Sequence, residues 1–223
     1  MLIELFDREF VEPQEAVGMQ VIGQFRDIDE ADNFVWLRGF ADMARRADAL
    51  EEFYSGPVWA RHRDCANGTM VNSDNVLLLR PVGPEGAFSL PAAPRPGPGT
   101  PGSGRGIIVS TICHLAPNTE ADFAELYARA VRPLLAETKA KVLAALVSER
   151  SANTFSRLPV REGETVFVWF SGFPSLHAYE THLAALAGLE TWTRSVLPQM
   201  DERAWCRNVV SRLVPTARSR LHG

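Results

Sequence analysis

The chain has 223 residues, 46% of them apolar and 22% charged, which suits one large or two small globular domains. A formal net charge of -4 and a pI near 5.8 argue against nucleic-acid binding, which needs a clustered positive surface. Three widely spaced cysteines, no apolar run long enough to span a bilayer and no signal-peptide pattern favour a cytoplasmic protein without a membrane partner.

The first 82 residues contain a helix followed by alternating extended and helical patterns. The chain begins inside an apolar helical stripe that includes Leu2, Leu5 and Phe6. Two runs rich in β-branched and aromatic residues, "MQVIGQFRD" and "FVWLRGF", predict strands. A helix is expected from about Asp42, the segment "PVWARHRD" comes next, and "NVLLLRPV" predicts the last strand of this part.

Residues 83–105, "GPEGAFSLPAAPRPGPGTPGSGR", hold six of the 15 prolines and six of the 16 glycines. This density does not support a helix or a sheet, so the segment is expected to be a linker. A flexible chain of this length reaches about 25 Å, enough to cross a small domain. The linker therefore allows the parts on either side to pack together.

The part after the linker shows a complete structural unit. The run "GIIVSTICHLA" (106–116) predicts a strand, and Thr119 is placed to cap a helix with an apolar stripe from Phe123 to Leu134. Later elements are strands in "VLAALVSE" (142–149), "ETVFVWFSGF" (164–173) and "AWCRNVVSRLV" (204–214), and helices over 175–187 and around Trp192. The order βαββαβ, with one short added helix, is typical of a ferredoxin-like unit.

The two parts repeat one pattern, because "FVWLRGF" (34–40) returns as "FVWFSGF" (167–173) at an offset of 133. This offset holds without a gap for more than forty residues, and it also pairs Leu50 with Leu183 and Trp59 with Trp192. The helical stripe that starts at Leu2 aligns with the one that starts at Phe123. We interpret the pattern as an internal duplication.

The duplication predicts an α+β fold. A ferredoxin-like sheet has helices on one face and leaves the other face apolar, so we expect two βαββαβ repeats to pack sheet to sheet as an intramolecular α/β-barrel. The first repeat has no counterpart of the strand at 107–115; that strand is expected upstream of Met1 or from another chain. The predicted organisation is a first repeat over 1–82, a linker over 83–105, a second repeat over 106–217 and a tail over 218–223.

The stretch "GQFRDIDEADNFVWLRGFADMARRADALEEFYSGPVWARHRDCANGTMVNSDNVLLLRP" resembles NIPSNAP-family proteins of the dimeric α/β-barrel superfamily. The resemblance is closest over residues 2–82, and the second half is similar to the same fold more loosely, through "FVWFSGF", Trp192 and "NVV". It implies ferredoxin-like units that close a β-barrel, usually by dimerisation, with a pocket between sheet and helices. The superfamily includes cofactor-free monooxygenases, polyketide cyclases, lactone isomerases and haem enzymes, so the fold does not choose the reaction.

Polar side chains present in only one half are the candidates for function. Residues 60–74, "ARHRDCANGTMVNSD", differ from their counterparts "TRSVLPQMDERAWCR", which favours a site near the first half. Arg38 alternates onto the strand face of Phe34 and Trp36, where a guanidinium suits a carboxylate or enolate. His62 is the candidate acid or base, with Asp64 or Asp74 to orient it. We predict catalytic roles for His62, Arg38 and Asp74, and substrate contacts for Arg26, Trp36, Trp59, Asn67 and Asn72.

Each candidate also has a structural interpretation. Arg38 is equally compatible with a surface arginine, His62 with a solvated histidine, and Trp36 with a core side chain. His114 and His177 are weaker candidates. The chain has no HExxH, GxSxG, P-loop or dinucleotide fingerprint, and no pairing signature supports haem ligation, so no bound cofactor or metal is expected.

Two functional classes remain. The first is a small-molecule enzyme without a bound cofactor, of isomerase, cyclase or oxygenase type, that acts on an acidic or enolisable substrate. The second is a noncatalytic ligand-binding or assembly module, which would bind without turnover and be insensitive to His62. In either class we expect a homo-oligomer, because edge strands and helix faces remain available.

Overall fold

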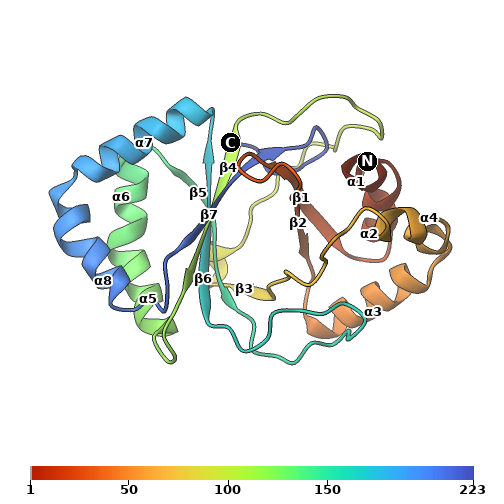
Figure 1. Ribbon diagram of the computed structural model, residues 1–223, viewed down its shortest axis with the longest axis horizontal. Helices are drawn as coiled ribbons and strands as arrows, with labels where there is room; N and C mark the ends of the chain where they lie inside the picture. Colours follow the sequence, from red (N-terminus) through yellow and green to blue (C-terminus); the bar gives the residue numbers. More distant parts are fainter. Residues whose placement is uncertain (1) are drawn as a thin grey trace.

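The computed structural model describes residues 2–223 (Figure 1). Its strands form one antiparallel seven-stranded sheet in the order β2-β1-β7-β4-β6-β5-β3. The alternating and β-branched runs of the sequence supply these strands, because they present side chains to both faces of a sheet. The strands are β1 Gln20–Asp27, β2 Phe34–Gly39, β3 Leu79–Pro81, β4 Ile107–His114, β5 Lys141–Ser148, β6 Val166–Phe173 and β7 Val209–Pro215.

The helices lie in two groups on opposite sides of the molecule, α1–α4 beside β1 and β2, and α5–α8 beside the strands of the second half (Figure 1). Within residues 2–223, no helix has the length and apolar character needed to cross a membrane. The helices are α1 Leu2–Leu5, α2 Val11–Ala16, α3 Met43–Ser55, α4 Pro57–Asn67, α5 Glu120–Leu126, α6 Arg132–Glu137, α7 Leu176–Gly188 and α8 Leu197–Asp201, with π-helical turns η1 Phe6–Phe10, η3 Tyr127–Val131 and η4 Trp192–Val196 and a 3₁₀ turn η2 Pro84–Gly86.

The sheet is curled, and both of its end strands, β2 and β3, come from the first half of the chain. The halves join edge to edge, because β1 pairs with β7 and β3 pairs with β5. The enclosed face holds a core shared by both halves, which includes Phe25, Phe170 and Leu213. The predicted α+β class is therefore confirmed, and one curled sheet encloses the apolar face that needed a partner.

The linker is packed against this structure. The Phe88 ring lies 5.1 Å from the Phe170 ring, and Arg95 donates hydrogen bonds to the Glu15 carboxylate and the Val21 carbonyl. Apart from η2 and one isolated bridge, residues 83–105 contain no helix or strand, as their proline and glycine content predicted. Its apolar and arginine side chains nevertheless fix part of the linker in place.

The C-terminal tail is also packed into the fold. Leu221 belongs to the core shared by both halves and is 3% exposed. Arg218 is 1% exposed, and its guanidinium contacts the Glu12 carboxylate and the Asp7 carbonyl on the first helical segment. These contacts tie the end of the chain to its beginning.

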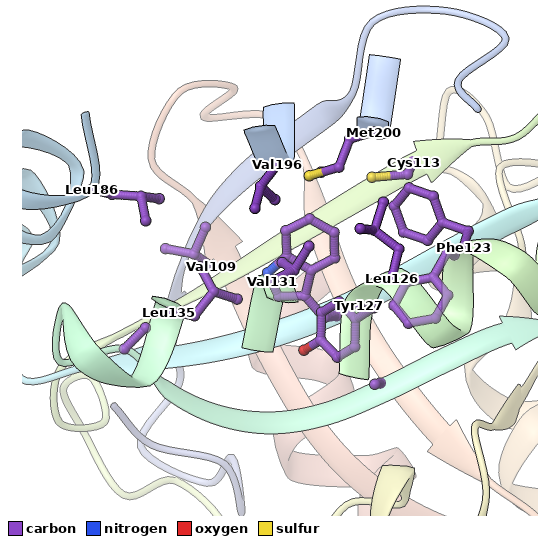
Figure 2. Close-up of a cluster of buried hydrophobic side chains, with 14 of the residues drawn as sticks. Val109, Cys113, Phe123, Leu126, Tyr127, Val131, Leu135, Leu186, Val196 and Met200 are labelled. Carbon is purple, nitrogen blue, oxygen red and sulfur yellow. The ribbon is translucent and has the colours of Figure 1, made fainter. Parts of the chain in front are cut away.

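Two further apolar cores lie between helices and sheet, one in each half. In the second half, side chains from α5, η3, α6, α7, η4 and α8 meet β4 and β6, with Tyr127 and Val131 near the centre (Figure 2). In the first half, side chains from α1, η1, α2, α3 and α4 meet β1 and β2. The apolar stripes predicted for these helices supply both cores.

The structure contains every element predicted for the second half, but the last strand of each half is shorter than predicted, and β7 begins at Val209 instead of at 204. Only Leu79–Pro81 pairs with β5. The preceding backbone is engaged outside the sheet, because the Val76 carbonyl accepts from the Arg161 amide and the Leu78 carbonyl accepts from the Glu149 amide. The loop after β5 thus takes up the residues expected to extend β3.

Elements of the two halves recur at two fixed offsets. At an offset of 121, η1 matches η3 and β1 matches β5, and both strands have an irregularity at the same place, after Val21 and after Val142. At an offset of 133, α3 matches α7, and both helices have a side-chain cap, Asp42 and Ser175.

The shared core predicts the effect of truncating Phe25, which is fully buried. Phe25→Ala is expected to lower the free energy of unfolding by about 3–5 kcal/mol, because it leaves a cavity between the halves. Ile28→Ala, three residues later at a 36% exposed position, is the control and is expected to change it by under about 1 kcal/mol. Equal effects in urea denaturation would contradict a core at this place.

Candidate functional site

A narrow pocket lies in the first half between β2 and the helices that cover it, with a volume of about 40 Å³. That space holds about three water molecules. Rings stack around it, and Phe34 and Trp36 lie 5.1 Å apart on β2 with Phe6 packed against both. The lining residues are Leu2, Phe6, Phe10, Gln14, Phe34, Trp36, Arg38, Phe53, Tyr54, Trp59, Ala66 and Met70.

Arg38 places a positive charge in this aromatic pocket. Strand alternation puts its side chain on the face of Phe34 and Trp36, as predicted. Its guanidinium Nη1 donates to Gln14 Oε1 at 3.2 Å and contacts the Tyr54 hydroxyl at 3.5 Å. Among the described residues these partners are neutral, and no carboxylate forms an ion pair with Arg38 within 4 Å.

Gln14 and Tyr54 are held by their own contacts. Gln14 is 1% exposed, and its amide nitrogen donates to the Phe10 carbonyl one turn earlier, which turns its oxygen toward Arg38. The Tyr54 ring packs edge-on against Trp59, at 4.7 Å between centroids. The polar end of the pocket is therefore preorganised.

The second half has a different composition at the corresponding positions. The offsets place Leu135 where Gln14 stands, Ser171 where Arg38 stands and Ala187 where Tyr54 stands. Leu135 and Ser171 are buried at 3% and 4% exposure. The second half thus has no arginine, amide or phenol at these places, and the buried polar side chain of its helix-covered core is instead His182 on α7, which bonds to the Thr138 carbonyl.

A second arginine lies close to the first. Arg46 on α3 is 4% exposed, and its guanidinium donates to Asn153 Oδ1 at 3.0 Å and Thr154 Oγ1 at 3.1 Å. Burial, and then the charge of Arg38, lowers the pKa of Arg46 from its ordinary value. Within residues 2–223 neither arginine has a carboxylate partner, so this region carries excess positive charge that favours an anion.

His62 lies beside the pocket and does not line it. It shares a face of α4 with Trp59 and Ala66, and its ring lies 6.1 Å from that of Phe10. Its Nε2 is 3.6 Å from Glu9 Oε2. A hydrogen bond from Arg8, with a further contribution from the charge of His62, lowers the pKa of Glu9, so this carboxylate is ionised near neutral pH. The carboxylate that faces His62 is therefore Glu9.

The other predicted site residues are not brought to the pocket. Asp74, Asn67 and Asn72 are exposed, and the Asn72 side chain accepts from the Asp74 amide in a turn. Arg26 is exposed on β1. Asp64 is exposed and pairs with Arg63, not with His62. Of the predicted residues, the structure gathers Arg38, Trp36 and Trp59 in the pocket and His62 beside it.

Sequence reasoning missed Gln14, Tyr54 and Glu9. For Gln14 and Tyr54 the sequence contained a signal. Each is a polar residue at a position where the other half has an apolar one, Leu135 and Ala187. Glu9 gave no comparable signal, since pairing with His62 depends on how the first helical segment packs against α4.

A larger hollow of about 340 Å³ lies beside β3 and the loop after β5. It contains mostly polar groups, and both of its arginines are paired with carboxylates within the chain. Arg161 makes a two-point ion pair with Glu164, which also lies 3.4 Å from His114. Arg150 pairs with Glu120. Because these two arginines already have carboxylate partners and Arg38 has none among residues 2–223, the smaller pocket around Arg38 is the better candidate for an anion site.

Comparison with known proteins reveals similarity of fold. No family profile and no curated protein matches the chain. A solved anthrone oxidase-like protein is 14% identical, with a TM-score of 0.53, and the match covers 97% of this chain and 92% of that one. A candidate monooxygenase of Lactobacillus acidophilus is 9% identical, with a TM-score of 0.52, over 97% and 88% of the two chains. The chain shares their fold.

A NIPSNAP-like domain protein from Burkholderia xenovorans also matches, at 15% identity and a TM-score of 0.41, over 52% of this chain and 90% of that one. The fold implied by the resemblance, shared with monooxygenase-like proteins, is confirmed.

The unpaired charge of Arg38 predicts an unusual effect on stability. Arg38→Met is expected to leave the free energy of unfolding unchanged or raise it by up to about 2 kcal/mol, because it removes a charge without an ionic partner. The control is Arg218→Met, which removes a buried arginine paired with Glu12 and is expected to lower stability by about 2–4 kcal/mol. If both variants lose a similar amount of free energy of unfolding in urea denaturation, Arg38 stabilises the folded protein, which would contradict this expectation.

Proposed function

We propose that the pocket around Arg38 binds a small aromatic molecule with an acidic or enolisable group, and that the protein is an enzyme without a bound cofactor. One observation carries the proposal: a guanidinium that has no carboxylate partner among residues 2–223 stands inside an aromatic wall, beside neutral partners. Such a group is suited to receive an anionic oxygen by charge-assisted hydrogen bonds. The apolar rings around it strengthen that attraction by excluding water.

The chemistry suited to this arrangement is removal of a proton next to a carbonyl. The proton passes to the His62 imidazole, whose positive charge is then stabilised by Glu9. The electron pair moves onto the carbonyl oxygen, and the resulting enolate is stabilised by Arg38. Isomerases, cyclases and cofactor-free oxygenases share this first step, so the proposal covers all three types.

The structural matches agree with this class of substrate. One match is described as anthrone oxidase-like and another as a candidate monooxygenase. An anthrone is an aromatic ketone that enolises, which is the kind of molecule that an aromatic pocket with a guanidinium would accept. The match is one of fold, and the fold alone does not choose the reaction.

We also propose that the chain is a duplicated ferredoxin-like unit, with repeats over 1–82 and 106–217 forming one barrel in which the first repeat lacks its first strand. The equal spacing of β1 with β5 and of α3 with α7 supports this, as does the recurrence of η1 as η3. The vacant strand position would lie between β2 and β3, the ends of the curled sheet. A cytoplasmic homo-oligomer remains part of the proposal.

The alternative is a module that binds a ligand without converting it. His62 stands beside the pocket and not in its lining, which favours this alternative. The two functions differ in one respect: only the enzyme requires His62 once the ligand is bound.

Phenylpyruvate tests the proposal, since it combines an aromatic ring, a carboxylate and an enolisable methylene. In D₂O, the protein is expected to speed loss of the methylene signal in proton NMR. His62→Gln should lower this rate about 100-fold or more without weakening binding, whereas Arg38→Met should weaken binding about tenfold or more. The controls are His177→Gln and Arg194→Met, exposed positions in the second half.

Three outcomes separate the possibilities. Hydrogen–deuterium exchange of the phenylpyruvate methylene that depends on both His62 and Arg38 supports the proposal that the protein is an enzyme. Binding that depends on Arg38 without any exchange, repeated with anthrone as the substrate, supports the noncatalytic module. Binding that Arg38→Met leaves unchanged would contradict both.

A further inference from the structure

The loop between β5 and β6, residues 149–165, is the main difference in length between the two halves. The corresponding connection in the first half, between β1 and β2, covers only residues 28–33. The offset is 121 up to β5 and 133 from β6 on, so the second half carries twelve more residues here. Long loops without helices or strands in compact proteins usually have a function.

The added residues reach across to the first half and pass beneath α3 (Figure 1). Asn153 and Thr154 accept hydrogen bonds from Arg46, and the Thr154 hydroxyl donates to the Met43 carbonyl at 3.1 Å. The Phe155 ring is 6% exposed and stacks on the Tyr54 ring at 5.8 Å and 25°. The loop of one half therefore packs against α3 and against Tyr54, a residue that lines the candidate site in the other half.

The two parts of this loop are held differently. Its end near β6 is anchored by the two-point ion pair of Arg161 with Glu164 and by a hydrogen bond from Arg161 to Asn75. The middle is held on α3 by neutral partners of Arg46, by one aromatic ring, and by Arg157, which donates to the Tyr54 carbonyl and forms an exposed ion pair with Glu51 at 3.7 Å, a kind of pair that adds little stability. Such contacts are weak enough to break and reform, whereas the anchored end stays in place.

Tyr54 links this loop to the pocket. One side of the Tyr54 ring stacks on Phe155, and its hydroxyl contacts Arg38. The volume of about 40 Å³ is too small for an aromatic acid, so entry of a ligand requires a wall to move. Phe155 is therefore the loop residue placed to restrict movement of Tyr54, the wall residue whose hydroxyl contacts Arg38.

We propose that residues 151–158 form a lid, in which Phe155 controls access of an aromatic anion to the pocket through Tyr54. The identity of the ligand as an aromatic anion rests on the proposed function, whereas the movement of the loop does not depend on it. In the closed state the lid holds Tyr54 over Arg38 and keeps Arg46 occupied by Asn153 and Thr154. In the open state Tyr54 and both arginines are free to face the ligand.

The first test measures binding rates with 3-phenylpropionate, an aromatic carboxylate without an enolisable ketone. Stopped-flow tryptophan fluorescence follows its entry, since Trp36 and Trp59 line the pocket. Phe155→Ala is expected to raise the association and dissociation rates about tenfold each and to change Kd by less than about threefold, as opening a lid should. Ser156→Ala, at an exposed neighbouring position, is the control and should leave both rates unchanged.

The second test needs no ligand. In a Trp205→Phe background, which removes a tryptophan that is 74% exposed, acrylamide quenching reports on access to the remaining indoles. Deletion of residues 151–162, and Phe155→Ala as a milder change, are expected to increase quenching at unchanged far-UV circular dichroism. Ser156→Ala should not.

The outcomes of the two tests distinguish the claims. If 3-phenylpropionate binds and Phe155→Ala leaves its rates unchanged, the lid is wrong while the binding site stands. If 3-phenylpropionate does not bind, the proposal that the pocket binds aromatic acids fails. The acrylamide quenching experiment then tests by itself whether residues 151–158 act as a lid. Unchanged quenching in both loop variants would overturn it.

Discussion

The structure depends on the burial of one apolar sheet face. A ferredoxin-like sheet covered by helices on one side exposes apolar side chains on the other. Exposure of so large an apolar surface to water is unfavourable, so it is normally buried against a partner. In this protein the pairings of β1 with β7 and of β3 with β5 join the halves into one curled sheet around that face. The linker and the tail pack against the same core through Phe88 and Leu221. The outer face of the sheet is then free to form a separate helix-covered core in each half.

These two outer cores have similar architecture and different chemistry. In the second half, Leu135 and Ser171 stand where the first half has Gln14 and Arg38, and the core contains no arginine. In the first half, a guanidinium stands among rings and a second one lies buried nearby, without carboxylate partners in the described chain. A charge placed in this way costs stability, so its presence in only one half indicates use. The loop after β5 belongs to the second half but packs on α3 and on Tyr54, so one half supports a wall of the pocket in the other.

Much of the fold could be predicted from periodicity. The run at 166–173 and the helix at 176–188 were predicted because period-two and 3.6-residue patterns specify which side chains are buried. The short length of β3 could not be predicted in this way. The residues before it, Val76 and Leu78, form backbone hydrogen bonds with a loop that lies 70 or more residues later in the sequence. Arg38 was found through strand alternation beside Trp36. Glu9 was not found, because its approach to His62 depends on how separate helical segments pack together. Nothing in the sequence around Phe155 indicates that its ring would stack on Tyr54.

The central claim is that Arg38 holds an anion inside the aromatic pocket, and a crystal structure with bound 3-phenylpropionate tests it most directly. The account predicts electron density with the carboxylate at the Arg38 guanidinium and the ring between Trp36 and Trp59. It also predicts that Tyr54 turns away from its present position. Density only at the polar hollow beside β3, or a pocket that stays closed at saturating ligand while Arg38 keeps its contacts to Gln14 and Tyr54, would contradict it.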